Sequence, residues 1–136
     1  MSVTPQLPDG MIQRPSPLSV SETVARLTAA IEAAGAKLFM IVDHSGEAAA
    51  AGVSLRDTKL LIFGSPEAGT AIMDAAPLAA LDLPLKILVW DDAGQTWMTF
   101  LSPDWLAARH GISDWLSSPL GAVDLLTGKI ADAPAA

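Results

Sequence analysis

The chain has 136 residues, enough for one domain with its own hydrophobic core, and 51% of them are hydrophobic. Its net charge of −7 argues against nucleic acid or an anionic membrane as partner, because both are bound through a basic face. It contains no cysteine, which excludes disulfides, thiolate nucleophiles and sulfur-ligated metal sites.

The N-terminal segment, residues 1–17, contains four prolines and shows little periodicity, so it predicts an extended arm. The segment also lacks the apolar stretch of a secretory signal peptide. We therefore expect a cytoplasmic protein, and no apolar run approaches the ~20 residues that span a bilayer.

The first regular element is a helix. Apolar residues recur every three or four positions over residues 20–34, Ser19 is placed to cap the helix and Gly35 to end it. The following residues, 37–44 (KLFMIVDH), are apolar on both faces of an extended chain and predict a buried strand.

Two further elements lead to the middle of the chain. Residues 45–52 suit a short helix that begins at a Ser45 cap, and residues 58–63 (TKLLIF) predict a second buried strand. A helix then starts with Ser65 as N-cap and Pro66 in its first turn. It should end before Pro77, because the residue before a proline disfavours helical geometry.

The clearest hairpin comes next. Residues 81–90 predict a third strand, residues 91–94 (DDAG) a turn of solvated residues, and residues 95–101 a fourth strand. A hairpin makes the sheet at least partly antiparallel, so the fold class is α+β. Leu85, Ile87 and Val89 should form a pure core face, while the mixed opposite face could meet a partner chain or line a shallow pocket.

The C-terminal part is helical. Residues 102–111 predict a short capped helix, and residues 112–130 predict one broken or two short helices with the break at Ser118–Pro119. We expect a single α+β domain over residues 18–112, followed by a C-terminal helical extension and tail at 113–136.

Several of these motifs occur together in one known family. They are Asp43-His44, Thr58, the run from Leu60 to Gly64, Pro66, Gly69-Thr70, Ala75-Ala76-Pro77, the run from Ala80 to Lys86, Val89-Trp90 and the run from Ala107 to Gly111. In their order they resemble the domain of unknown function family number 302, over roughly residues 14–112. The resemblance implies a curved, mainly antiparallel sheet of about four strands backed by helices, with TATA-binding-protein-like topology. It also implies a homodimer, and it implies no activity.

The stretch GSPEAGT at residues 64–70 has the glycine spacing of a phosphate-binding P-loop, but it lacks the lysine that neutralises the phosphates. Pro66 removes one main-chain donor and Glu67 adds a negative charge. We interpret the stretch as a capped strand-to-helix corner, and we predict no cofactor.

Two histidines raise the question of a metal. Asp43, His44, Glu47 and His110 could form a mixed nitrogen and oxygen site if the fold brought them together. No HxxxH or HExxH spacing occurs, and a histidine near a helix C-terminus is explained by the helix dipole. We predict no metal site.

The polar side chains near the predicted strand ends form a candidate ligand site: His44, Ser65, Thr70, Asp82 and Lys86. Because a lysine in an apolar strand is rarely left unpaired, we expect Lys86 to pair with Asp82 or Asp43. The leading hypothesis is a non-enzymatic homodimeric domain that binds a small molecule or a protein. The alternative is a small enzyme, with or without a metal ion, that uses His44 with Asp82 or Lys86. A third hypothesis is a structural interaction module with no pocket.

Overall fold

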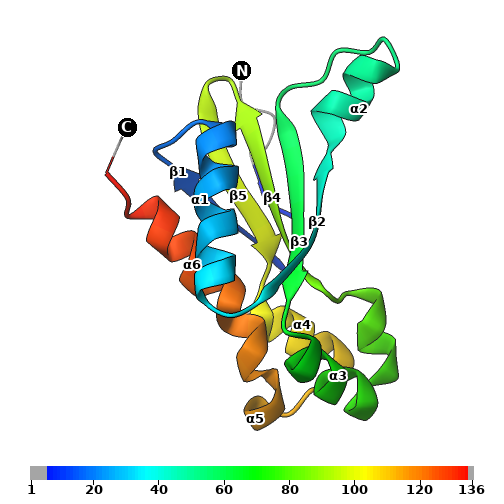
Figure 1. Cartoon of the computed structure of the whole chain (residues 1–136). Coiled ribbons are helices and arrows are strands. Elements are labelled where there is room, and N and C mark those ends of the chain that lie inside the picture. The colour runs from blue at the N-terminus through cyan, green and yellow to red at the C-terminus, as the bar shows by residue number, and fades with distance from the viewer. Residues whose placement is uncertain (1–5, 135–136) are drawn as a thin grey trace.

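A computed structural model, which describes residues 6–134, contains one five-stranded sheet in the order β1-β5-β4-β3-β2 (Figure 1). Every neighbouring pair of strands is antiparallel. The strands are β1 (Met11–Ser16), β2 (Lys37–Asp43), β3 (Thr58–Gly64), β4 (Leu85–Asp92) and β5 (Gln95–Leu101). The predicted α+β class is confirmed, with five strands in place of about four.

Helices connect the strands and follow them. They are α1 (Val20–Ala33), α2 (His44–Ala50), α3 (Pro66–Ala75), α4 (Pro103–His110), α5 (Asp114–Ser117) and α6 (Ala122–Ala131), with short 3-10 helices η1 (Pro77–Leu81) and η2 (Ser118–Gly121). The two helices α1 and α6 lie side by side on one face of the sheet, whereas α3, α4 and α5 gather at one end of it (Figure 1).

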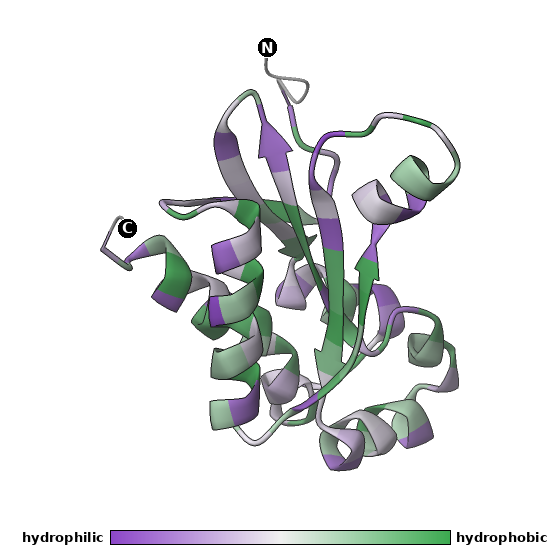
Figure 2. Ribbon diagram, turned by 45° about the horizontal axis from the view of Figure 1, so that its top comes forward, coloured by the Kyte–Doolittle hydropathy of each residue, from purple (hydrophilic) through white to green (hydrophobic). Residues whose placement is uncertain are grey.

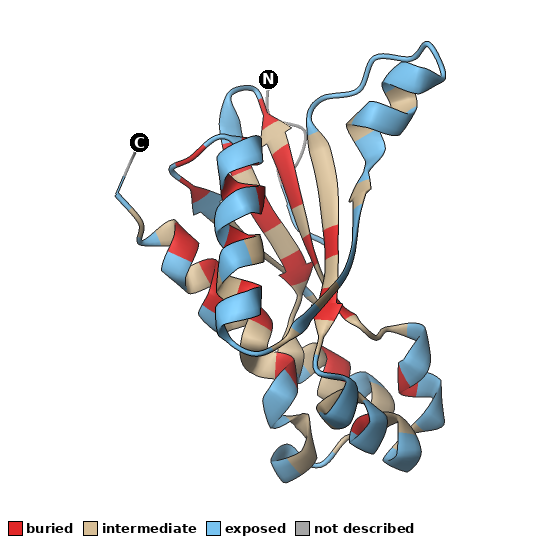
Figure 3. Ribbon diagram, in the orientation of Figure 1, coloured by how far each residue is buried: buried red, intermediate tan, exposed pale blue. Residues whose placement is uncertain are grey.

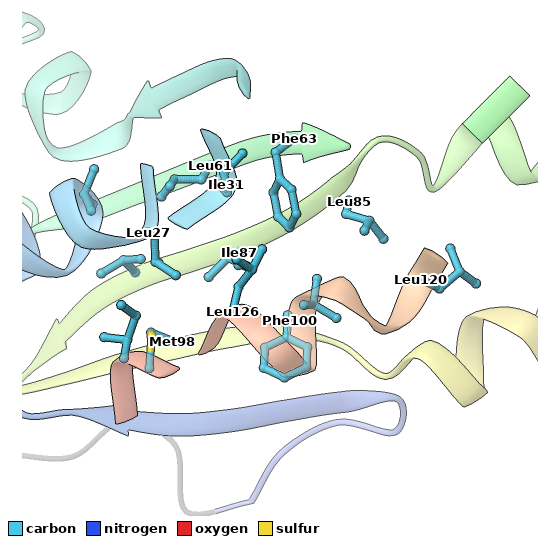
Figure 4. Close-up of a cluster of buried hydrophobic side chains, with 14 of the residues drawn as sticks. Leu27, Ile31, Leu61, Phe63, Leu85, Ile87, Met98, Phe100, Leu120 and Leu126 are labelled. Atoms are coloured by element: carbon cyan, nitrogen blue, oxygen red, sulfur yellow. The ribbon is translucent and has the colours of Figure 1, made fainter. Parts of the chain in front are cut away.

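The hydrophobic core lies between the sheet and these two helices. Leu85, Ile87 and Val89 of β4 are buried in one cluster with Leu27 and Ile31 of α1, which confirms the predicted core face (Figure 4). Buried and half-buried residues alternate along the central strands, as expected when helices cover only one face (Figure 3).

The opposite face of the sheet, called here the second face, carries the other set of side chains. Cross-strand pairing aligns Leu60 with Leu88 and Thr99, and Ile62 with Lys86. All five residues are half-buried. Three of these five residues are apolar, and the one cation, Lys86, lies near the start of β4.

The fifth strand is β1, which lies within the predicted N-terminal arm. It pairs with β5 from Met11 to Ser16, although Pro15 has no main-chain N–H to donate. Because β1 is an edge strand, one side of it needs no partner, and a proline is tolerated there. The proline content hid this strand from the sequence pattern.

The hairpin between β4 and β5 is tighter than predicted. Its turn is Ala93-Gly94, and both residues have positive φ, 52° and 94°. Asp91 and Asp92 belong to β4, and Asp92 is buried, so the prediction of two solvated turn residues was wrong. A two-residue turn of this type matches the twist of the strands, which pulls the aspartates into the sheet.

The C-terminal helix α6 is part of the core. Val123, Leu126 and Ile130 are buried in the same cluster as the sheet residues. The break at Ser118–Pro119 is confirmed, because η2 separates α5 from α6 there. The residues predicted as an extension thus contribute one of the two helices that cover the sheet.

Edge strand β2 differs from the predicted buried strand. Phe39, Met40 and Ile41 are 43%, 58% and 38% exposed. Figure 2 shows β2 as largely apolar and Figure 3 shows it as largely exposed. A strand at the sheet edge keeps apolar surface in solvent, because one lateral side of β2 has no neighbouring strand among residues 6–134.

Two adjacent leucines in α6 test whether this helix is integral to the domain. We expect Leu126→Ala to lower the free energy of unfolding by about 2–4 kcal/mol, because it leaves a cavity in the core. Leu125→Ala, at a side chain that is 72% exposed, should change it by less than about 0.5 kcal/mol. Urea unfolding followed by circular dichroism measures both. Equal effects would show that α6 does not belong to the cooperative unit.

Candidate functional site

The structure divides the five predicted site residues among three places. Ser65 and Thr70 line one pocket, beside α3. Asp82 and Lys86 line a smaller pocket at the second face. His44 lines neither. The predicted single ligand site is therefore two separate candidate sites.

The larger pocket, called here the α3 pocket, has a volume of about 520 Å³. This lies within the roughly 300–1,000 Å³ typical of small-molecule sites. None of the residues that line it is charged: they are Ala34–Ala36, Phe39, Phe63–Pro66, Ala68–Thr70, Ile72, Met73, Leu83–Leu85, Pro119, Leu120 and Ala122. They come from the α1–β2 connection, the ends of β3 and β4, α3 and the η2 region.

The wall of the α3 pocket is set by the corner between β3 and α3. The Ser65 hydroxyl oxygen accepts a hydrogen bond from the main-chain N–H of Ala68, 3.4 Å away, and Pro66 occupies the first turn, as predicted. Thr70 Oγ1 donates to the carbonyl of Pro66 at 2.6 Å. The Ser65 hydroxyl proton is thus the main polar group left for a ligand.

This corner is unsuited to phosphate. Pro66 has no N–H to offer, Ser65 already occupies the Ala68 donor, and Glu67 stands in the first turn. The absence of charged lining residues agrees with the interpretation of this stretch as a structural corner.

Asp82 forms the centre of a charged cluster at the other pocket. Its Oδ2 lies 2.6 Å from His110 Nε2 and 3.3 Å from Arg109 Nε. The Asp82 and His110 side chains are only 16% and 9% exposed, so their contact is held away from solvent. The Arg109 guanidinium also lies over the Trp105 ring, 5.3 Å from its centroid.

Lys86 pairs with neither predicted carboxylate, so that prediction was wrong. Its ammonium donates instead to the main-chain carbonyls of Pro84, at 3.1 Å, and Asp82, at 3.4 Å. The Asp82 carboxylate is turned toward α4, and Asp43 lies next to Lys59, 3.5 Å away.

The start of α2 forms a separate polar cluster. Asp43, rather than the predicted Ser45, caps this helix by accepting from the main-chain N–H of Gly46 at 2.9 Å. That hydrogen bond, with a second from Ser45, holds the pKa of Asp43 below its ordinary value. The contribution of this cap is therefore present above the ordinary pKa and is lost as the pH falls through the lowered one.

His44 lies far from the other predicted groups. It follows Asp43, which pairs with Lys59, and Lys59 in turn pairs with Val89 of β4. Asp82 precedes Leu85, the first residue of β4, and so lies beyond the other end of that strand. The alternative enzyme that joined His44 to Asp82 or Lys86 therefore lacks the required geometry. Within residues 6–134, no group of three or more His, Asp or Glu side chains could hold a metal ion.

Two features were missed by the sequence analysis. The contact between His110 and Asp82 joins residues 28 positions apart, and no local pattern announces it. Asp92 is buried with its Oδ1 3.6 Å from Arg56 Nη1 and, in the part of the chain that is described, without a hydrogen-bond partner for that oxygen. The two adjacent aspartates before Ala-Gly gave the only signal, and they favoured a turn.

Residues 12–124 match the model of the family described as Domain of unknown function DUF302. A solved structure described as uncharacterized conserved protein DUF302 from Bacillus stearothermophilus shares the fold, with a TM-score of 0.75 and 15% sequence identity. The similarity covers 92% of this chain and 98% of that one.

Curated relatives carry a different name. "Fluoride-specific ion channel FluC 1" of Brucella suis biovar 1 (strain 1330) is 39% identical over 120 residues, 88% of this chain and 46% of that protein. "Fluoride-specific ion channel FluC 2" of Brucella melitensis biotype 1 (strain ATCC 23456 / CCUG 17765 / NCTC 10094 / 16M) is also 39% identical over 120 residues, 44% of its length. This chain spans less than half of these relatives. Over residues 6–134, it has no helix of the length and apolarity that crossing a membrane requires.

Proposed function

The chain belongs to the DUF302 family, whose name assigns no activity, and we propose that it is a binding domain for a small, neutral, apolar molecule. The observation that carries this proposal is the α3 pocket, whose volume of about 520 Å³ suits such a molecule and whose lining contains no charged residue. A charged ligand would lose its hydration there without gaining a partner. A ligand with one hydrogen-bond acceptor could use the Ser65 hydroxyl.

A glycine in the pocket wall allows a direct test. A Cβ added at Gly69 would meet only the Met73 methyl group, at 3.9 Å, so Gly69→Leu fits the helix while filling the pocket. We expect it to weaken the binding of N-phenyl-1-naphthylamine, a neutral fluorescent probe, at least tenfold. Because glycine disfavours helix interiors, the variant should not lose stability.

Ala71→Leu is the matched control, since Ala71 is an exposed residue of the same helix and does not line the pocket. It should bind the probe as the unchanged chain does, in a fluorescence titration with one site per chain. Equal affinities for all three proteins, or no saturable binding to any, would contradict the assignment of the α3 pocket.

We further propose that the domain is a homodimer joined through β2. The outer side of this edge strand has no neighbouring strand among the described residues, its centre is apolar and exposed, and it contains no proline. In a two-fold antiparallel pair that overlaps the whole strand, Lys37 of one copy comes near Asp43 of the other. Such pairing would cover Phe39, Met40 and Ile41.

Methionines on the two sheet edges test the dimer. Met40 lies at the centre of β2, so Met40→Lys brings two like charges together on the two-fold axis and should yield a monomer. Met11→Lys changes an exposed methionine of the opposite edge strand β1 and should remain a dimer. Light scattering at micromolar concentration measures both. A monomeric unchanged chain, or a dimeric Met40→Lys variant, would refute the β2 interface.

The curated relatives favour a second candidate function, that of a domain acting with a fluoride channel. The supporting observation is 39% identity over 88% of this chain to proteins that carry this name and are more than twice the matched length. A segment that occurs in one chain with further sequence commonly acts together with that sequence.

Growth on fluoride tests this candidate. A fluoride-sensitive bacterium would express the Brucella suis relative without its matching segment, with or without this chain. If the chain acts on the channel, its co-expression should raise the tolerated fluoride concentration at least twofold. No change, under conditions where the intact relative protects the cells, would contradict this function.

A further inference from the structure

The second face holds a cation in an apolar setting. Lys86 lies between Leu85 and Ile87, whose side chains point into the core, so its own side chain points to the opposite face. There it lines a pocket of about 180 Å³ with Leu60, Leu88 and Thr99, and the pocket reaches the core residues Leu85, Phe100, Leu106 and Val123. We call this space the Lys86 pocket.

The charge of Lys86 is not neutralised. Among residues 6–134, no carboxylate oxygen lies within 4.0 Å of its Nζ, because Asp82 is engaged by His110 and Arg109. Its two hydrogen bonds go to main-chain carbonyls, which are dipoles and carry no net charge. An ammonium has three N–H donors, so one donor remains. A half-buried cation of this kind favours an anionic partner.

We propose that the Lys86 pocket binds a short-chain monocarboxylate. The carboxylate accepts the third N–H of Lys86 and neutralises its charge, while the hydrocarbon chain contacts Leu60, Leu88 and Leu101. A volume of about 180 Å³ is below the range of roughly 300–1,000 Å³ for larger ligands, so the acid is short. One cation beside the carboxylate of Asp82 suits a single negative charge better than two.

The site differs from the α3 pocket in chemistry, and Leu85 is the one lining residue that the two pockets share. The α3 pocket has no charged lining residue, whereas the Lys86 pocket includes one cation and one carboxylate. Failure of one assignment therefore leaves the other standing. Gly69→Leu, which fills the α3 pocket, should leave the binding of a short carboxylate at Lys86 unchanged.

A pair of probes that differ only in the head group tests the site. Hexanoate, followed by amide chemical shifts in NMR spectra, should shift Leu88, Thr99 and Leu101 in a saturable manner. 1-Hexanol, which keeps the chain but lacks the charge, should bind at least tenfold more weakly. Equal binding of the two probes would show that the apolar wall alone is responsible.

Two variants isolate the ammonium. Lys86→Met keeps the length of the side chain and should weaken hexanoate binding at least tenfold, whereas Lys86→Arg keeps the charge and should retain measurable binding. Thermal unfolding of both variants establishes that they are folded. Undiminished hexanoate binding by folded Lys86→Met, or no saturable shift at tens of millimolar hexanoate in the unchanged chain, would overturn the proposal.

Discussion

The packing of two helices on one face of an antiparallel sheet is the constraint on which the rest of the structure depends. Strand side chains alternate between faces, so α1 and α6 can bury only every second residue of β3, β4 and β5. Leu61, Ile87 and Met98 are fully buried by this arrangement. The residues between them must form the second face, and whatever that face binds, it binds with half-buried apolar side chains around Lys86.

The same constraint sets the position of the α3 pocket. At the end of β3 the chain leaves the sheet at Gly64, and the Ser65-Pro66 corner starts α3 at one end of the sheet (Figure 1). The space between α3, the α1–β2 connection and η2 is then walled by small and apolar residues. Small residues such as Gly64 and Gly69 leave room that larger side chains would fill, so the pocket follows from the local sequence. Its neutral lining is what distinguishes it from the Lys86 pocket.

Much of the fold follows from local chemistry that is visible in the sequence. The alternation in Leu85, Ile87 and Val89 gave the core face, and Ser65 with Pro66 gave the start of α3, because each depends on neighbouring residues alone. β1 was hidden because Pro15 is tolerated only at an edge, and the sequence does not say which strand is an edge. The exposure of β2 was missed for the same reason, because the sequence does not show that β2 is an edge strand.

The candidate sites were less predictable, since their contacts join distant parts of the chain. Asp82 and Lys86 were identified as site residues, yet the partner of Asp82 is His110 on α4 and not Lys86. A lysine in an apolar strand suggested a carboxylate partner, but the Lys86 ammonium donates to the main-chain carbonyl of Asp82 and not to its side chain. Ser65 and Thr70 were placed in a site for their polarity, although the pocket that they line is mainly apolar.

The most direct measurement of the central claim, a preformed apolar pocket beside α3, is a crystal structure of the protein under xenon pressure. Xenon occupies apolar space and avoids polar, hydrated space. The pocket predicts a xenon atom among the side chains of Phe63, Ile72 and Leu120. Ordered water in that space with no xenon, or collapse of α3 onto the sheet, would contradict it.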